Sequence, residues 1–262
     1  MVRLSRTIRF TIPDRPLEGS GGESGLNGFG GKPTMCGLGR YYELDVRCTG
    51  DPDPQTGYLI NIKAVDDAVR ACAVPFIADQ VSRPGADPIG LIGPLLGTLR
   101  AALPVETPSV AWRLTPFLEL EARMGDEKVL VRQRFEFSAS HRLHVPRLSD
   151  EENRRIFGKC NNPAGHGHNY RVEPCVAVDP ARPLAFDAIE SIVDQHVIEP
   201  LDHKHLNSQV AEFSDEGGVN PSVEHIARVC FDRLAGPLCE AGAELRAVTV
   251  WETDRTSCTY PA

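Results

Sequence analysis

The feature that most constrains the fold of this chain is a weak internal repeat with an offset of 128 residues. The matches are Gly39 with Gly167, Tyr42 with Tyr170, and FGGK at 29–32 with FGKC at 157–160. A repeat restricts the fold to architectures in which one supersecondary unit occurs twice. The length of 262 residues also exceeds one average domain. We therefore predict two domains of similar architecture, at 1–124 and 128–262.

Hydrophobic alternation and helix-start signals give both halves the same order: two strands, two helices and a weaker final strand. In the first half we predict strands at 4–12 and 41–49, a short strand end at 58–60, a helix from Asn61 to about 72, another helix at 89–103, and a strand at 110–122 with a kink at Pro116. In the second half we predict strands at 129–139, 170–178 and 245–251, a helix at 186–197, and another from Asn220 to about 234. A capping box at Ser149 and Glu152 starts a further short helix, and 124–127 is the predicted linker. An antiparallel sheet with both helices on one face fits this order, so the predicted class is α+β.

Charge and apolar patterning argue against two classes of partner. The formal net charge is −8, whereas a nucleic-acid-binding protein is expected to carry a basic face. No apolar run approaches the length of a membrane span, and the first residues lack the apolar core of a secretory signal. The eight cysteines are scattered without C-x-x-C pairs, which favours reduced thiols. We expect a cytoplasmic protein that binds neither nucleic acid nor membrane.

The histidines are confined to the second half, since all eight lie at or beyond His141. His166 and His168 are two residues apart, and residues i and i+2 of a strand point to the same face. With His141 from another strand they form a candidate three-histidine metal site. Zinc held by three protein ligands keeps a fourth position open for water or substrate, which is the catalytic arrangement. We therefore predict zinc bound by His141, His166 and His168.

The first repeat does not keep these residue types. At the 128-residue offset, Leu38 stands opposite His166, Arg40 opposite His168 and Lys32 opposite Cys160. We predict that 1–124 is a degenerate repeat without metal ligands and that 128–262 carries the metal chemistry.

Four segments of the second half carry a specific resemblance to a known family. They are FSASHRLH at 137–144, FGKCNNPAGHGHNY at 157–170, LDHKHLN at 201–207 and VWETD at 250–254. On these segments, in order and with matching spacing, the chain resembles the 6-pyruvoyl-tetrahydropterin synthase family. The resemblance implies a tandem T-fold (tunnelling fold), in which each repeat is an antiparallel four-stranded sheet with two helices on one face. Subunits of that fold join their sheets into a barrel, so the resemblance also implies a homo-oligomer, with a homotrimer of tandem chains as the geometric expectation.

The resemblance also implies an activity and the residues that perform it. The expected enzyme is a zinc-dependent lyase that eliminates triphosphate from 7,8-dihydroneopterin triphosphate, with an internal redox rearrangement of the side chain. Carried onto this sequence, the family's residues are His141, His166 and His168 for zinc, Cys160 as the base with Asp202 and His203 assisting, and Glu252, Ser222 and Glu224 for the pterin. The family builds its active sites between subunits.

Independently of the resemblance, these residue types suit the expected chemistry. A thiolate near a cation can act as a base, and a carboxylate such as Asp202 can orient a histidine. A carboxylate such as Glu252 accepts two parallel N–H donors of the kind that a pterin edge offers. The remaining histidines, His144, His196, His205 and His225, are expected to be structural or at the surface. The basic cluster Arg147, Arg154, Arg155 and Lys159 is expected to be a solvated helix face whose charge can steer a triphosphate.

Other functions remain open from the sequence. One is a 6-carboxy-tetrahydropterin synthase of queuosine biosynthesis, which shares the zinc site and the substrate. The five residues between Cys160 and His166 favour the pyruvoyl type, because the carboxy type typically has a shorter segment there. Another is a non-catalytic pterin-binding protein, against which the presence of Cys160, Asp202 and His203 argues. A zinc hydrolase would need a glutamate beside its ligands, as in H-E-x-x-H, and the sequence has none.

Overall fold

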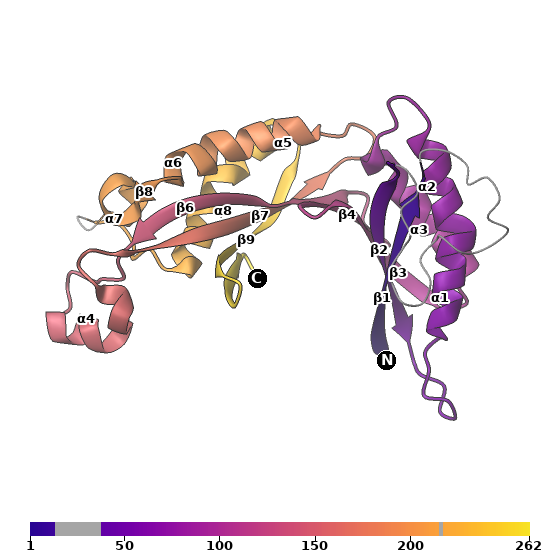
Figure 1. Cartoon of the computed structure of the whole chain (residues 1–262), viewed down its shortest axis with the longest axis horizontal. Coiled ribbons are helices and arrows are strands. Elements are labelled where there is room, and N and C mark those ends of the chain that lie inside the picture. Colours follow the sequence, from indigo (N-terminus) through magenta and orange to yellow (C-terminus); the bar gives the residue numbers. More distant parts are fainter. Residues whose placement is uncertain (14–37, 215–216) are drawn as a thin grey trace. The chain divides into compact units, whose positions relative to one another are not determined.

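The computed structural model describes residues 1–13, 38–214 and 217–262, in which the chain forms two compact units (Figure 1). Unit 1 comprises Met1–Val131 with Asp179–Pro183, and unit 2 comprises Arg132–Val178 with Leu184–Ala262. Both units combine helices with antiparallel strands, as predicted for the α+β class. Across the described ranges, no helix is both long enough and apolar enough to cross a membrane. The repeat match at 29–32, with Lys32, lies outside the described residues.

Unit 1 is built on four antiparallel strands. Their order is β1 (Val2–Ile12), β2 (Arg40–Gly50), β3 (Glu106–Thr115) and β4 (Leu118–Arg123). The segments α1 (Ile62–Ala68), η1 (Val69–Ala73), α2 (Val74–Val81) and α3 (Pro88–Ala102) cover one face of this sheet (Figure 1). Alternate strand residues such as Ile8, Phe10 and Leu44 are completely buried beneath them, as the two-residue period of a strand requires.

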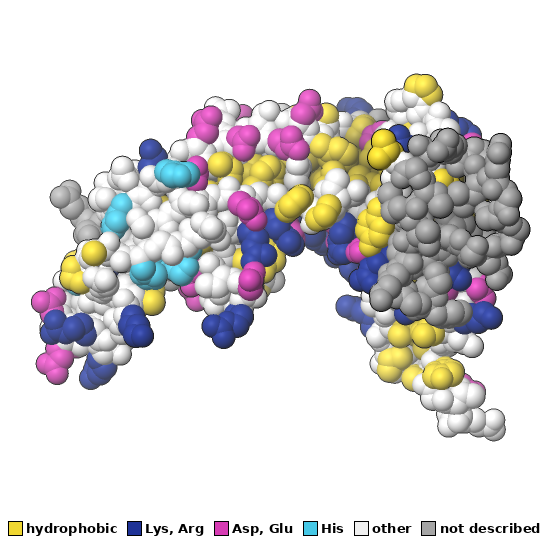
Figure 2. Space-filling model, viewed as in Figure 1, with side chains coloured by type: hydrophobic (Ala, Val, Ile, Leu, Met, Phe, Trp, Pro, Cys, Tyr) yellow, Lys and Arg dark blue, Asp and Glu magenta, His cyan; other side chains and the backbone are white. Residues whose placement is uncertain are grey.

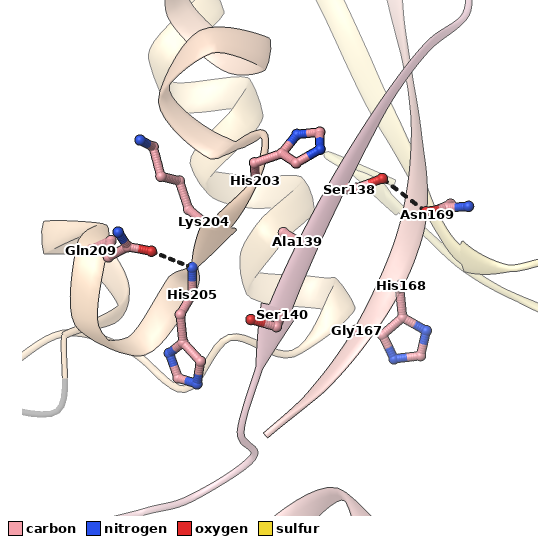
Figure 3. Close-up of a pocket in the computed structure, with 10 residues that line it drawn as sticks. All are labelled: Ser138, Ala139, Ser140, Gly167, His168, Asn169, His203, Lys204, His205 and Gln209. Atoms are coloured by element: carbon pink, nitrogen blue, oxygen red, sulfur yellow. Dashed lines mark hydrogen bonds between the residues drawn. The ribbon is translucent and has the colours of Figure 1, made fainter. Parts of the chain in front are cut away.

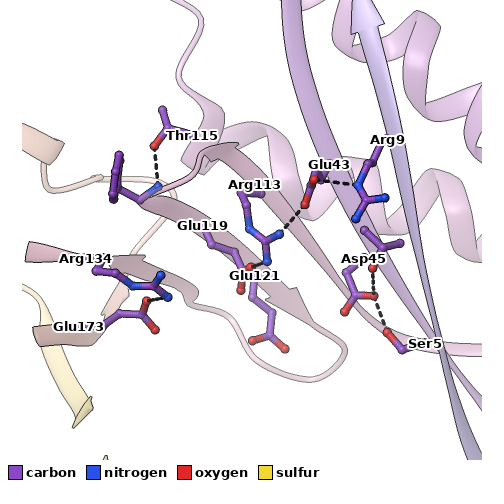
Figure 4. A network of polar contacts seen from close by, with 12 residues as sticks. Ser5, Arg9, Glu43, Asp45, Arg113, Thr115, Glu119, Glu121, Arg134 and Glu173 are labelled. Atoms are coloured by element: carbon purple, nitrogen blue, oxygen red, sulfur yellow. Dashed lines mark hydrogen bonds and ion pairs between the residues drawn. The ribbon is translucent and has the colours of Figure 1, made fainter. Parts of the chain in front are cut away.

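The opposite face of the unit 1 sheet carries interlocking charged side chains (Figure 4). Arg9 lies 3.0 Å from Glu43, and Arg113 bridges Glu43 and Glu119. These residues alternate with the buried ones along their strands, so each strand presents one apolar and one charged face.

Two strand predictions in unit 1 are wrong. The segment predicted as one strand at 110–122 is the hairpin of β3 and β4, with its turn at Pro116 and Phe117. Proline has no N–H to donate across a continuous ladder, which explains why the chain turns there. The strand predicted at 58–60 does not form.

The helix predicted to begin after Asn61 does so, because the Asn61 side chain accepts a hydrogen bond from the Lys63 N–H at 3.0 Å. It continues to Val81 instead of ending near Cys72, through a π-helical turn at η1 and then α2. Pro75 follows that turn and cannot donate an i→i−4 hydrogen bond. A π turn is one of the adjustments by which a helix continues past such an interruption.

The strands of unit 2 are also mainly antiparallel. The strands β6 (Phe135–His141), β7 (His166–Val178), β9 (Glu244–Thr253) and β10 (Thr256–Tyr260) pair in the order β6-β7-β9-β10, and the short β8 (Lys204–His205) pairs parallel to β6. The strand predicted at 129–139 is in fact two strands, β5 (Val129–Gln133) and β6, which separate at Arg134.

The helical segments of unit 2 differ from the prediction mainly in length. They are α4 (Asp150–Phe157), η2 (Gly158–Asn161), α5 (Phe186–Val193), η3 (Asp194–Ile198), α6 (Glu199–Leu201), α7 (Leu206–Gln209), η4 (Ala211–Phe213) and α8 (Val223–Glu240). The capping box at Ser149 is confirmed. The helix predicted to begin at Asn220 begins at Val223 with Ser222 as its N-cap, because the Asn220 side chain instead accepts from the His144 N–H at 3.1 Å.

Both units place an aromatic pair at the corresponding point of their first two strands. Phe10 is opposite Tyr42 in unit 1, with ring centroids 6.0 Å apart. Phe137 is opposite Tyr170 in unit 2, with stacked rings 5.0 Å apart. The two tyrosines are the ones that the 128-residue offset matches, so the sequence match has a structural counterpart.

We predict that Phe10→Ala lowers the free energy of unfolding by about 3–5 kcal/mol, the usual cost of removing a completely buried aromatic ring. Urea denaturation followed by circular dichroism measures the change. Tyr58→Ala is the control, because the Tyr58 side chain is exposed and its removal should cost about 0.5 kcal/mol or less. Similar losses in the two variants would contradict the described core of unit 1.

Candidate metal centre and active site

The three predicted zinc ligands meet on one face of the β6–β7 pair. His141 ends β6 and is directly opposite His166, which begins β7, while His168 is opposite Ala139. Alternation along both strands puts the three imidazoles on the side of the sheet that also holds Phe137. Each histidine offers one nitrogen, and these three atoms all lie within 4.8 Å of one another.

Hydrogen bonding fixes the tautomer of His141. Its Nδ1 lies 2.7 Å from the carbonyl oxygen of Pro221, and a carbonyl only accepts, so Nδ1 carries the proton. The Nε2 atom therefore presents its lone pair to the cluster, where it lies 3.1 Å from the Nε2 of His166. A backbone carbonyl in this role is a common way to orient a metal-binding histidine.

The environment favours the neutral form of two of the three histidines, His141 and His166. Burial lowers the pKa of His141 to about 4, and burial followed by the proximity of His168 also lowers the pKa of His166. Neutral imidazole is the form that binds metals. Two buried ring nitrogens, His166 Nδ1 and His168 Nε2, have no hydrogen-bond partner among the described residues. Neutral, closely spaced nitrogens with an unsatisfied atom fit a bound cation.

Glu252 and Tyr170 complete the surroundings of the histidines. The Oε1 atom of Glu252, on β9, lies 3.5 Å from His141 Nε2 and 3.7 Å from His168 Nε2. The Tyr170 hydroxyl lies 3.3 Å from His141 Nδ1. Burial raises the pKa of Tyr170, and the negative charges of Glu252 and Cys160 add to the effect. Tyr170 was not among the predicted site residues, although its place two residues after His168 on the same strand indicates the same face.

Cys160 is anchored close to the strand that ends at His141. It lies in η2, half-buried, and its carbonyl oxygen accepts from the Leu143 N–H at 2.9 Å. The neighbouring Asn161 side chain donates to the Leu143 carbonyl at 2.8 Å. These two bonds hold the cysteine against the segment that follows His141.

Ser222 and Glu224 are connected to the metal cluster through the start of α8. Pro221, whose carbonyl orients His141, directly precedes Ser222. A hydrogen bond from the Ser222 hydroxyl lowers the pKa of Glu224 and keeps its carboxylate charged. The sequence did not identify the Pro221 carbonyl, because its role arises only when the loop before α8 reaches the end of β6.

Asp202 and His203 form the expected hydrogen-bonded pair. They lie at the edge of β6 that faces away from β7. His203 Nδ1 donates to Asp202 Oδ2 at 2.6 Å, and the Ser138 N–H donates to Asp202 Oδ1 at 2.7 Å. Ser138 alternates with the buried residues of β6, so its side chain points away from the face that holds His141. A cavity of about 600 Å³ in this region is lined by His203 and Ser138 and also by His168 of the histidine cluster (Figure 3). One chain thus brings the three histidines together with Glu252 and anchors Cys160 to the segment after His141, whereas the Asp202–His203 pair lies at the outer edge of β6.

Comparison with known proteins identifies the family of unit 2. A family model described as 6-pyruvoyl tetrahydropterin synthase matches residues 130–262. The chain belongs to this family. The human 6-pyruvoyl tetrahydrobiopterin synthase is 42% identical over 134 residues, which are 50% of this chain and 89% of the human protein. The enzyme of that name from Poecilia reticulata is 40% identical over 47% of this chain and 84% of its own length.

A solved structure matches the same proportion of the chain. The structure of the Caenorhabditis elegans 6-pyruvoyl tetrahydropterin synthase is 33% identical, covers 51% of this chain and 94% of its own, and has a TM-score of 0.47. Membership of the family confirms the resemblance read from the four sequence segments, and with it the T-fold class and an enzymatic role. The matched range contains every residue of the cluster.

We predict that the purified protein binds a divalent cation at this cluster and that His166→Ala removes the site. Loss of a ligand should weaken binding by more than the roughly 10–100-fold that loss of an outer-shell partner costs. Competition with a chromophoric chelator measures the affinity. His196→Ala is the matched control, because His196 lies in η3, outside the cluster, and retention of the metal is expected. Equal affinity in the two variants would rule the cluster out as the metal site.

Proposed function

We propose that the chain is a zinc-dependent lyase of the 6-pyruvoyl-tetrahydropterin synthase type. It would eliminate triphosphate from 7,8-dihydroneopterin triphosphate with an internal redox rearrangement of the side chain. The observation that carries the proposal is the convergence of three histidines and Glu252, with Cys160 anchored to the segment after His141, within the range that matches the family. Zinc is the cation that best suits three imidazoles with room for a further ligand.

The residues around the cluster take separate roles in this proposal. Bound zinc would act as a Lewis acid toward the hydroxyl groups of the substrate side chain. Cys160, anchored beside the strand that ends at His141, would take and return protons at the side-chain carbons. The carboxylate of Glu252 would accept the parallel N–H donors of the pterin edge, with Ser222 and Glu224 at the start of α8 as further contacts.

We propose that Asp202 and His203 act on the site of a neighbouring copy. The proposal is supported by the place of the pair, which is bonded to the outer edge of β6, whereas Cys160 is anchored to the segment after His141. Assembly of copies would supply the pair to an adjacent Cys160, with Asp202 holding His203 in one orientation. The proposed assembly is a homo-oligomer, with three tandem chains supplying six units.

The first repeat, 1–124, is proposed to be a partner that completes this assembly without metal chemistry. Its aromatic pair Phe10–Tyr42 corresponds to Phe137–Tyr170, which supports a common origin of the two repeats. The positions matched to the metal ligands hold Leu38 and Arg40, and no second metal cluster occurs in the part of the chain that the structure describes. A cytosolic location is proposed from the scattered cysteines alone.

The direct test is to incubate the zinc-loaded protein with 7,8-dihydroneopterin triphosphate and to identify the pterin product by mass spectrometry. The expected product is the 6-pyruvoyl pterin. A 6-carboxy product would transfer the assignment to the 6-carboxy-tetrahydropterin synthase of queuosine biosynthesis. No turnover by folded, zinc-loaded protein would leave a non-catalytic pterin-binding role.

We predict that Cys160→Ala lowers kcat by about 10²–10⁴-fold, the usual contribution of a positioned proton-transfer group, while zinc affinity stays within about twofold. Steady-state kinetics and chelator competition provide the two readouts. Cys239→Ala is the matched control, because this exposed thiol lies near the end of α8 and its loss should leave kcat unchanged. Full turnover by Cys160→Ala would remove the thiol from the proposed chemistry.

The triphosphate is proposed to occupy a basic cavity next to Cys160. This cavity of about 480 Å³ is lined by Arg142, Arg154 and Lys159, with Asp150 as its acidic group. Arg142 directly follows the predicted ligand His141, and its guanidinium is held by the Asn161 carbonyl at 3.1 Å. Figure 2 shows Lys and Arg side chains gathered around α4, in a chain whose net charge is −8. Of the basic cluster noted in the sequence, only Arg154 and Lys159 line this cavity.

We predict that the double variant Arg154→Gln/Lys159→Gln raises KM for the triphosphate substrate roughly 10–100-fold, because two charge-assisted hydrogen bonds are lost. Binding of dephosphorylated 7,8-dihydroneopterin, measured by fluorescence titration, should not change. Arg155→Gln is the control on the same helix, since Arg155 does not line the cavity. An equal effect on both ligands would argue against a phosphate subsite.

A further inference from the structure

The segment 142–145 follows β6 and belongs to no strand, yet asparagine side chains satisfy much of its main chain. The Arg142 N–H donates to Asn207 Oδ1 at 2.8 Å, and Asn207 Nδ2 donates back to the Arg142 carbonyl at 3.0 Å. In the same way, Asn153 accepts from the Val145 N–H at 2.8 Å and donates to the Val145 carbonyl at 3.0 Å. A primary amide can do both, because it carries donors and an acceptor as a peptide group does. The asparagines therefore hold this segment in the way that a neighbouring strand would.

Asn161 is the asparagine of this set that also belongs to the segment of Cys160, since it directly follows the cysteine in η2. Its buried Nδ2 atom donates to the Leu143 carbonyl at 2.8 Å and lies 3.1 Å from His144 Nδ1, so each of its two hydrogens has an acceptor. In return, the Leu143 N–H donates to the Cys160 carbonyl at 2.9 Å. Residues 160 and 161 thus bind Leu143 at both its N–H and its carbonyl.

The main chain of Asn161 makes a separate connection to Arg142. The Asn161 carbonyl accepts from Arg142 Nε at 3.1 Å, and a terminal nitrogen of the same guanidinium lies 3.5 Å from Asn161 Oδ1. Arg142 directly follows His141 and lines the basic cavity beside η2. The carbonyl bond does not depend on the side chain of Asn161. Substitution of that side chain therefore removes the bonds to Leu143 and His144 and keeps the main connection to Arg142.

We propose that Asn161 is a positioning residue, which fixes Cys160 relative to His141 by tying their two segments together through Leu143. The inference rests on the proposed function, in which Cys160 moves protons at the substrate side chain. Proton transfer needs the reacting atoms within hydrogen-bond reach, and a displacement of about 1 Å can lower a rate by about 10²-fold. Asn161 acts through Cys160, and Asn153 holds Val145 without a bond to η2.

Steady-state kinetics of the full-length, zinc-loaded protein provide the first test. Asn161→Ala should lower kcat by about 10–100-fold and keep KM within about threefold, because the thiol moves while the Arg142 bond remains. Asn161→Asp keeps the shape of the side chain and lacks its donors, so it should lower kcat similarly. Thermal unfolding confirms that each variant is folded.

Asn153→Ala is the matched control. Asn153 is also buried, and its side chain donates to the carbonyls of Val145, Leu148 and Ser149. Its loss should lower the free energy of unfolding at least as much as Asn161→Ala does, because more hydrogen bonds are removed. The kcat of Asn153→Ala should nevertheless stay within about threefold of the wild type.

Alkylation of Cys160 by iodoacetamide provides a second readout that needs no turnover, since the mass of the proteolytic fragment that contains Cys160 reports the reaction. The thiol is half-buried, and loosening of η2 should expose it more often. The alkylation rate should therefore rise about 5–30-fold in Asn161→Ala and stay at the wild-type value in Asn153→Ala.

Wild-type kcat and wild-type alkylation in both Asn161 variants would overturn the inference and leave the proposed function intact. Equal losses of kcat in Asn161→Ala and Asn153→Ala would give Asn161 a purely structural role, which also overturns it. If the wild type shows no turnover, the proposed function fails on its own. Faster alkylation in Asn161→Ala alone would then still support the anchoring of Cys160, and equal alkylation in all variants would overturn that as well.

Discussion

The candidate active site depends on the register in which β6 pairs with β7. His141 faces His166 only in this register, and a slip of one residue would move His166 and His168 to the opposite face of the sheet. The stacked pair Phe137–Tyr170 lies four residues along the same two strands and favours the same register, because large aromatic rings opposite one another stabilise strand pairing. The Pro221 carbonyl then selects the His141 nitrogen that faces the cluster.

The proposed catalytic residues lie at two different places on β6, its buried face and its outer edge. The buried face ends at the histidine cluster, whereas the outer edge binds Asp202 and His203 through the main chain of Ser138. In the proposed assembly, a catalytic set divided in this way would give each copy half of two sites, so that activity would require assembly. Unit 1 has a comparable apolar core but a charged outer face, with Arg113 between two glutamates, and lacks histidines entirely.

The sequence was sufficient to predict features that depend on neighbouring residues alone. The two-residue spacing of His166 and His168 placed them on one face, and the side chains of Asn61 and Ser149 marked helix starts correctly. The sequence was insufficient where a contact distant in sequence determines the local structure. The Asn220 side chain accepts a hydrogen bond from the His144 N–H instead of capping α8. The helix also continues past Pro75 through a π turn that the sequence pattern does not predict.

The most direct test of a site divided between copies is complementation. Cys160→Ala chains and His203→Ala chains, each inactive alone, are denatured together, refolded as mixed oligomers with zinc, and assayed for the pterin product. If the site is divided between copies, the mixture regains turnover. A His203→Ala chain then contributes an intact Cys160, and its Cys160→Ala neighbour contributes an intact Asp202–His203 pair to the same site. A mixed oligomer that is confirmed by mass yet remains as inactive as its parents would contradict it.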